Sequence, residues 1–292
     1  MTKFIKFTLT IFTALFLTII YGLAAKPIHA DLSNKYIHST TPTLFFHGYG
    51  SGAHAEEYMV NGFVKAGVSK TVITADVAGD GTVTLKGDIP HNAINPLVMV
   101  NFNDNHSTNY ELQGQWVKNV LEELQAKYHF KKVNIEAHSM GNMAVMYFLL
   151  ANAGNHNLPQ IQKQVAMAGT FDGAIGWNEP ANLTVNKKTG KPSAMNDFYQ
   201  KLLPLRHRYP RQIKLLNIYG DLKDGNDSQV SNASCLSLKY LINNRACSYR
   251  EVKITGPNAK HELLHHNPQV NKILINFFWG SNNAALISLL VI

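Results

Sequence analysis

Ser139 lies in a sequence that is typical of a nucleophile held on a sharp turn. The segment Ala137-His138-Ser139-Met140-Gly141 follows a predicted strand at 132–137, and a second apolar segment comes after it. A nucleophile elbow has the pattern G-x-S-x-G between a strand and a helix, where the turn presents the Ser above the sheet. Ala137 replaces the first Gly here. Because the pentapeptide alone also fits a Ser that caps an ordinary helix, the rest of the chain has to distinguish the two.

A Ser hydroxyl is a poor nucleophile at neutral pH, so it needs a base and a third group that orients that base. The loop 220–227 offers Asp221, Asp224 and Asp227. We predict Asp227 as the acid, with Asp221 second, because only Asp227 is followed three residues later by a Val, Val230, as in many hydrolases. The same three carboxylates could bind Ca²⁺, but their spacing is not that of an EF-hand.

His261 is the predicted base, because it is the first His after the last predicted strand and the order Ser, acid, His is that of an α/β-hydrolase. We expect His265 and His266 to be surface or packing residues. His261 to His265 also matches H-E-x-x-H, the zinc-peptidase pattern, which needs a helix that places both His on one face. Gly, Pro and Asn before the motif and a Pro after it leave no long helix, so we predict neither a metal nor a cofactor.

Two backbone N–H groups are the predicted donors to the oxyanion that attack by Ser139 would create. One belongs to Met140, the residue after the nucleophile. The other is assigned to Tyr49, in the glycine-rich turn 47–52 that follows an early strand. This turn lacks the Lys-Ser/Thr end of a phosphate-binding P-loop, so we favour an oxyanion loop over a phosphate site.

Strands and helices alternate along most of the chain, and they are the elements that must position these residues. We expect strands near 42–46, 71–84 (a hairpin about Ala78–Gly81), 96–102, 132–137, 164–168, 213–219 and 248–255. Amphipathic helical patterns lie between them, most clearly at 112–128. The fold class predicted is therefore α/β, an α/β-hydrolase fold at 42–280 with a mostly parallel sheet and helices on both faces. The irregular segment 170–211 is either a cap-like insertion over a pocket or a surface excursion.

The first thirty residues are predicted to be a signal peptide or a retained N-terminal membrane anchor. Lys3 and Lys6 precede an apolar run at 7–25, and Ile28-His29-Ala30 offers a cleavage site. Either alternative places the rest of the chain outside the cytoplasm, at the cell surface or in the medium. Residues 31–41 would then be a linker, and the apolar tail 281–292, too short to span a bilayer, has no assigned role.

The composition of the chain limits the classes of binding partner that we expect. The net charge is +8, but the basic residues are dispersed and not interleaved with aromatic ones, so nucleic-acid binding is not expected. The positive charge either attracts anionic envelope polymers or lipid head groups, or simply keeps the surface soluble. Cys235 and Cys247 would form a disulfide in an exported protein or remain buried thiols.

These motifs resemble those of a family of Gram-positive bacterial cell-surface α/β-hydrolases. The resemblance covers about residues 40–280 and implies the fold and a Ser-Asp-His triad, but no particular reaction. The shared motifs are the export segment, H-G-Y-G at His47–Gly50, H-S-M-G-N at His138–Asn142, the acidic loop Asp221–Val230, and H-x-x-L-H-x-N-P-x-V at His261–Val270.

More distantly, the chain is similar to the small lidless bacterial lipases. They also have A-H-S-M-G at the elbow, and their catalytic His precedes by nine residues a Val that opens the last helix, as His261 precedes Val270. Asn142, where those lipases have Gly, and the segment 170–211 depart from that pattern.

We therefore predict an exported serine hydrolase that cleaves a carboxylic ester of a small molecule or a lipid, using Ser139, His261 and Asp227. An envelope acyltransferase or amidase would use the same triad. A catalytically idle surface-binding protein and a zinc peptidase are the alternatives from other classes.

Overall fold

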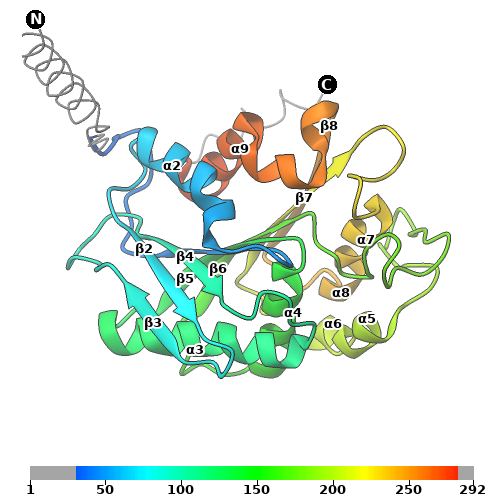
Figure 1. The fold of residues 1–292 in the computed structure, drawn as a ribbon, viewed down its shortest axis with the longest axis horizontal. Helices are drawn as coiled ribbons and strands as arrows, with labels where there is room; N and C mark the ends of the chain where they lie inside the picture. The colour runs from blue at the N-terminus through cyan, green and yellow to red at the C-terminus, as the bar shows by residue number, and fades with distance from the viewer. Residues whose placement is uncertain (1–30, 282–292) are drawn as a thin grey trace, which may run out of the picture.

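A computed structural model describes residues 31–281, in which a twisted sheet of eight strands is covered by helices on both faces (Figure 1). The strand order is β3-β2-β4-β1-β5-β6-β7-β8, and every neighbouring pair is parallel except β2 and β3. The predicted α/β-hydrolase fold class is thereby confirmed. The predicted leader 1–30 and all but the first residue of the tail 281–292 lie outside the described residues.

The elements follow the expected alternation. The strands are β1 (Thr43–Phe46), β2 (Val72–Val77), β3 (Val83–Lys86), β4 (Leu97–Phe102), β5 (Lys132–His138), β6 (Gln160–Met167), β7 (Lys214–Asp221) and β8 (Ser248–Thr255). The longer helices are α2 (Glu57–Lys65), α3 (Tyr110–Tyr128), α4 (Gly141–Asn152) and α9 (Pro268–Trp279), and the shorter ones are η1 (Ala53–Glu56), α5 (Asp197–Leu202), α6 (Leu205–Arg208), α7 (Asn232–Leu236), α8 (Leu238–Ile242), η2 (Pro257–Ala259) and η3 (His261–His266). The hairpin predicted about Ala78–Gly81 is confirmed, since Val77 pairs with Val83.

Two apolar layers hold the sheet between the helices. One contains the inner faces of α3 and α4 and the side of the sheet against them, including the fully buried Val117, Leu121 and Val145. The other lies under α2 and α9 and includes Phe63 and Leu274. Each fully buried apolar side chain contributes roughly 1.5–3 kcal/mol relative to exposure. The eight strands of the sheet and both apolar layers lie within residues 31–281, so the described part of the chain has a core of its own.

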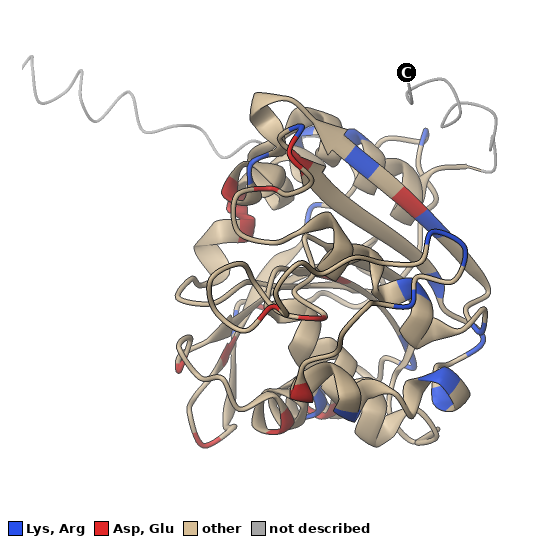
Figure 2. Ribbon diagram, turned by 90° about the vertical axis from the view of Figure 1, so that its right-hand side faces the viewer, with Lys and Arg blue, Asp and Glu red and all other residues tan. Residues whose placement is uncertain are grey.

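Charged side chains mark both edges of the sheet. The edge strand β8, which faces the viewer in Figure 2, carries Arg250, Glu251 and Lys253. The opposite edge, β3, is only four residues long and ends at Lys86. Short, charged edge strands are a common protection against pairing with another chain.

The segment 170–211, predicted as a cap-like insertion, divides into two parts. The second part forms α5 and α6, whose side chains Tyr199, Leu202 and Leu205 are completely buried in the layer that contains α4. The Tyr199 hydroxyl donates a hydrogen bond of 2.8 Å to the carbonyl of Ser237. This half is core and not a cap, because its apolar side chains are buried in the layer that contains α4. Only the first part approaches Ser139, as described below.

Residues 31–41, predicted as a linker, are irregular but fixed to the domain. Tyr36 pairs with Gly280 in an isolated bridge, and the Ile37 N–H donates to the carbonyl of Trp279 at 2.8 Å. The buried Asn95 amide donates to the carbonyls of Ile37 and Val68. The segment therefore belongs to the folded unit and runs along the edge at which the parallel strands begin.

The structure also describes the two cysteines and the apolar character of the helices. Cys235 and Cys247 are not joined, and the thiol of Cys235 is buried whereas Cys247 is exposed. Within residues 31–281 no helix has the length and apolar character needed to cross a bilayer.

Candidate active site

The turn at Ser139 joins β5 to α4 and has the geometry of an elbow. Ser139 has φ of +52°, in the left-handed region that non-glycine residues rarely adopt. A conformation of this kind costs of order 1–3 kcal/mol and persists only where the surroundings enforce it. Gly141 is required next to it, because a Cβ there would lie 2.6 Å from the carbonyl oxygens of Phe46 and His47.

Asn142 secures this turn, although sequence reasoning noted it only as a departure from the lipase pattern. Its side-chain nitrogen lies 2.9 Å from the carbonyl oxygen of Ala137 and 3.1 Å from those of Ser139 and Met167. Asn142 is completely buried. These contacts tie the strand end, the turn and the neighbouring strand β6 together, which a Gly at this position would not do.

The structure brings Ser139, His261 and Asp227 together in one line of hydrogen bonds. His261 Nε2 lies 2.9 Å from Ser139 Oγ, and His261 Nδ1 lies 2.8 Å from Asp227 Oδ2. All three are buried. Because an ionised carboxylate only accepts hydrogen bonds, this arrangement favours the proton on Nδ1 and leaves Nε2 free to accept the Ser hydroxyl proton.

The acidic loop holds Asp227 in this orientation. Its second oxygen, Oδ1, accepts hydrogen bonds from the backbone N–H groups of Gln229 at 3.0 Å and Val230 at 2.8 Å. Val230, whose spacing from Asp227 led to the choice of that acid, is buried. Further along, the His261 N–H donates to the Asp227 carbonyl at 2.8 Å, so main chain and side chains both join the acidic loop to the histidine loop.

Asp221, the second candidate for the acid, lies elsewhere. Its carboxylate pairs with Lys253 at 3.2 Å and accepts the N–H groups of Lys223 and Gly225. Desolvation by burial raises the pKa of Asp221, but these N–H groups and the Lys253 ammonium outweigh it and lower the pKa. No three acidic, His or Cys side chains within 31–281 are arranged to hold a metal ion, so the predicted alternative of a Ca²⁺ loop has no geometric support.

The H-E-x-x-H motif does not form the zinc-peptidase geometry. Residues 261–266 are a single 3₁₀ helix of six residues, in which the two His do not have the α-helical spacing that the motif needs. In addition, both ring nitrogens of His261 are already engaged, one with Ser139 and one with Asp227.

A row of imidazoles behind His261 was not predicted. The His138 ring lies 4.7 Å from the rings of His261 and His265, and His265 lies 4.7 Å from His266. His138 Nε2 donates to the carbonyl of His261 at 3.2 Å. Burial, and then the neighbouring His261 and His265, hold the pKa of His138 well below its usual value, and burial lowers that of His265 to about 4. Both are therefore neutral at neutral pH.

The loop after β1 carries the second predicted oxyanion donor. Phe102 N–H donates to His47 Nε2 at 3.0 Å, so His47 Nδ1 carries the proton and donates to the carbonyl of Gly48 at 2.8 Å. A Cβ on Gly48 would lie 2.9 Å from that of Ser139, which shows how closely the loop approaches. Within the described chain the N–H groups of Tyr49 and Met140 have no hydrogen-bond acceptor, and both residues line the pocket.

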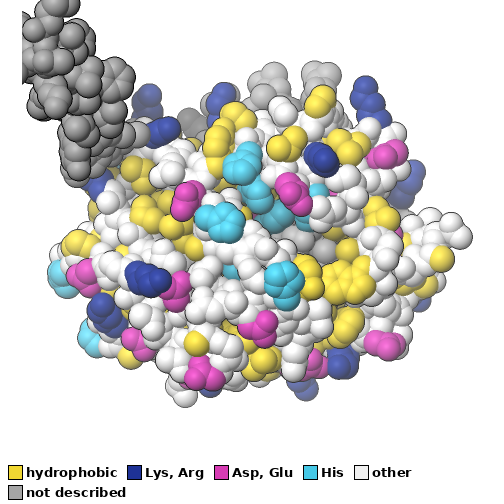
Figure 3. Space-filling model, viewed as in Figure 1, with side chains coloured by type: hydrophobic (Ala, Val, Ile, Leu, Met, Phe, Trp, Pro, Cys, Tyr) yellow, Lys and Arg dark blue, Asp and Glu magenta, His cyan; other side chains and the backbone are white. Residues whose placement is uncertain are grey.

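The pocket in front of Ser139 has a volume of about 770 Å³. Tyr49, Ile175 and Trp177 provide an apolar wall, with side chains 45%, 46% and 53% exposed. His265 and His266 also line the pocket. Figure 3 shows His side chains gathered beside an apolar patch on this face of the molecule. Of the described residues that line the pocket, Glu262 alone belongs to the Asp, Glu, Lys and Arg types.

Comparison with known proteins gives matches to a family model and to solved structures. The model of a family described as alpha/beta hydrolase of unknown function (DUF915) matches residues 30–281. A protein of Listeria innocua has a TM-score of 0.72 and 22% identity, over 82% of this chain and 94% of its own. A Lactobacillus plantarum protein described as a candidate cell surface hydrolase has a TM-score of 0.65 and 20% identity, over 81% and 88%. No curated protein matches. At these identities the structural likeness shows the fold.

Proposed function

Because the chain belongs to this family of α/β-hydrolases of unknown function, we propose that it is an exported serine hydrolase that cleaves a carboxylic ester through an acyl-enzyme. The observation that carries the proposal is the line of two hydrogen bonds, 2.9 Å and 2.8 Å, from Ser139 through His261 to Asp227. Such a line, on a strained turn at the mouth of a pocket, is the arrangement that activates a Ser hydroxyl.

In the first half of the reaction, Ser139 Oγ attacks the ester carbonyl carbon while His261 Nε2 takes its proton. Asp227 keeps the His261 ring in place and stabilises the imidazolium that forms. The negative charge on the former carbonyl oxygen is stabilised by the N–H groups of Met140 and Tyr49, and one such donor is typically worth about 10²–10³ in rate. The intermediate collapses when His261 gives the proton to the alcohol oxygen, which leaves.

In the second half, water takes the place of the alcohol. His261 removes a proton from the water, whose oxygen attacks the acyl carbon, and the oxyanion forms again in the same place. The proton then returns to Ser139 Oγ as the acid leaves. The apolar wall formed by Tyr49, Ile175 and Trp177 supports an acyl group as the part of the substrate that is bound there.

The direct test is to label the purified protein with a fluorophosphonate probe and to find the modified residue by mass spectrometry. We expect labelling at Ser139, unaffected by EDTA and abolished in Ser139→Ala. Ser51→Ala is the matched control, because Ser51 lines the same pocket and has no part in the line of hydrogen bonds.

A folded protein that does not label at Ser139 would contradict the proposal and favour a surface-binding role. If Ser139 labels, esters of one alcohol with acyl groups of increasing length identify the preferred acid. If Ser139 labels and no ester is hydrolysed, but the acyl group of an ester is transferred to an added amine or alcohol, the same residues would belong to an acyltransferase.

A further inference from the structure

A second groove lies at the edge of the sheet where the strands begin. It has a volume of about 510 Å³, and its lining includes Thr40 and Thr41, just before β1, and Phe130 to Lys132, at the start of β5. Ser139 follows the other end of β5. Seven residues of strand span roughly 23 Å, so this groove is separated from the Ser139 pocket by the full height of the sheet.

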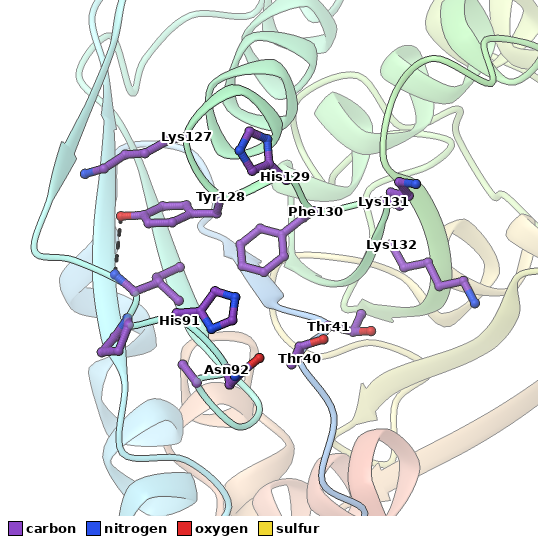
Figure 4. A pocket seen from close by; sticks show the side chains of 13 residues that line it. Thr40, Thr41, His91, Asn92, Lys127, Tyr128, His129, Phe130, Lys131 and Lys132 are labelled. Atoms are coloured by element: carbon purple, nitrogen blue, oxygen red, sulfur yellow. Dashed lines mark hydrogen bonds between the residues drawn. The ribbon is translucent and has the colours of Figure 1, made fainter.

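Basic side chains flank the groove. Lys127, Lys131 and Lys132 are exposed, and Figure 4 shows Lys127 on one side of the groove and Lys131 and Lys132 on the other, with Phe130 and His91 between them in this view. Lys127 is partly neutralised by Asp88 at 3.5 Å. Lys131 and Lys132 form no ion pair within residues 31–281, so their charges remain available to a ligand.

This chemistry fits an anionic ligand with a polar head. Helix α3 ends at Tyr128, beside the groove. The C-terminal end of a helix carries partial negative charge, which disfavours a bound anion. The effect of a helix end is confined to its last turn, where Lys127 lies, whereas Lys131 and Lys132 come after it. Thr41 and His91, which also line the groove, offer hydrogen-bonding groups, and Phe130 offers an aromatic face.

The position of the groove indicates where such a ligand would come from. Segment 31–41, which leads out of the predicted leader, runs along this edge and provides two of the lining residues, Thr40 and Thr41. The leader itself has an apolar run long enough to enter a bilayer. A leader that is still attached would therefore hold this edge, and not the Ser139 edge, close to the lipid surface.

We propose that this groove, with Lys131 and Lys132 on its rim, binds the phosphate head groups of anionic lipids and docks the domain on the membrane with the Ser139 pocket facing away. The docked protein would then take its substrate from the side opposite the membrane. A cleaved protein would keep some attachment to the surface through the same lysines.

The test uses sedimentation of residues 31–292, which include the whole sheet and both apolar layers, with vesicles of phosphatidylglycerol or of phosphatidylcholine. We expect binding to the anionic vesicles alone, weakening as ionic strength rises. A Lys131→Gln/Lys132→Gln variant should lose about 30-fold in partition, from roughly fivefold for each lysine near an anionic surface. Lys187→Gln/Lys188→Gln is the matched control, because it removes the same charge from two exposed neighbours in the loop between β6 and α5.

Three outcomes would overturn the proposal. One is the absence of binding to anionic vesicles by the native sequence. Another is an equal loss in both double variants, which would mean that net charge and not the groove is responsible. The third combines two results. Millimolar inorganic phosphate or a soluble polyanion abolishes the binding to phosphatidylglycerol at constant ionic strength, and the two double variants bind equally well, so that the binding does not depend on Lys131 and Lys132. Fluorophosphonate labelling of Ser139 in each variant checks the fold separately.

Discussion

We expect the native chain to lose stability as pH rises from acidic to mildly alkaline values. Glu56→Gln should remove much of this loss. Glu56 lies in η1, after the loop that carries Tyr49, and Glu136 lies in β5, shortly before Ser139. Both are completely buried, and none of their four carboxyl oxygens has a hydrogen-bond partner within the described chain. A buried carboxyl without a partner strongly favours its neutral form.

The magnitude follows from the pKa of Glu56, which burial raises from 4.5 to about 8. In the unfolded chain the carboxyl loses its proton near pH 4.5. Between the two values the folded state binds the extra proton, so stability is greatest below pH 4.5 and falls as pH rises to about 8. The difference, 8 − 4.5 = 3.5 units, corresponds to at most about 5 kcal/mol. Burial, and then the charge of Glu56, also raise the pKa of Glu136, which acts in the same direction.

The assay is urea unfolding at several pH values between 5 and 8. The native protein should lose free energy of unfolding across this range, and Glu56→Gln should lose clearly less, because an amide of the same shape does not ionise. Glu57→Gln is the control, since Glu57 is the next residue and is exposed. Parallel curves for the native protein and Glu56→Gln, or a native stability that is constant from pH 5 to 8, would refute the reasoning.

Further predictions concern the pocket. Asp227→Asn should lower the rate of Ser139 labelling by about 10³–10⁴-fold. Asp221→Asn, which changes a carboxylate that pairs with Lys253 outside the line of hydrogen bonds, should stay within about twofold; similar losses in both variants would contradict the assignment of the acid. Gly48→Ala should lower the labelling rate by about 10–100-fold, because its Cβ displaces Ser139, and Gly154→Ala, with nothing within 4 Å, should not. Trp177→Ala should raise KM about tenfold for esters with long acyl groups and leave short ones unchanged; an equal change for both would argue against an acyl site at Trp177.

Local patterns predicted the residues of the candidate site because each belongs to a short motif at a strand end. In a parallel sheet those ends meet at one edge, so Ser139, Asp227 and His261 had to lie near one another once the fold class was correct. The alternation of strands and helices and the burial of α4 could also be predicted, because they depend on local apolar patterns in the sequence. Tyr199 and its neighbours were missed because two short helices do not show a clear period in a polar segment.

Residues whose role depends on contacts between distant segments could not be predicted. Most carboxylates lie at the surface, and nothing near Glu56 or Glu136 in the sequence indicates that either is buried or that one lies near the other. His138 was seen only as part of the elbow motif. Its contacts with His261 and His265 exist because η3 folds back over β5, an arrangement that only the tertiary structure reveals.

The bridge between Tyr36 and Gly280 has a mechanical consequence. Near the first described residue, Asp31 contacts Lys70 and Ser33 contacts Gly67. Once these contacts had yielded, a force applied between the two ends of the described chain would be borne by this bridge and by the bond from Ile37 to Trp279. The long strands would carry no shear until those contacts had yielded. Either end of the described chain could therefore be pulled through a tether, or fused to another protein, while the Ser139 edge at the far end of the strands kept its shape.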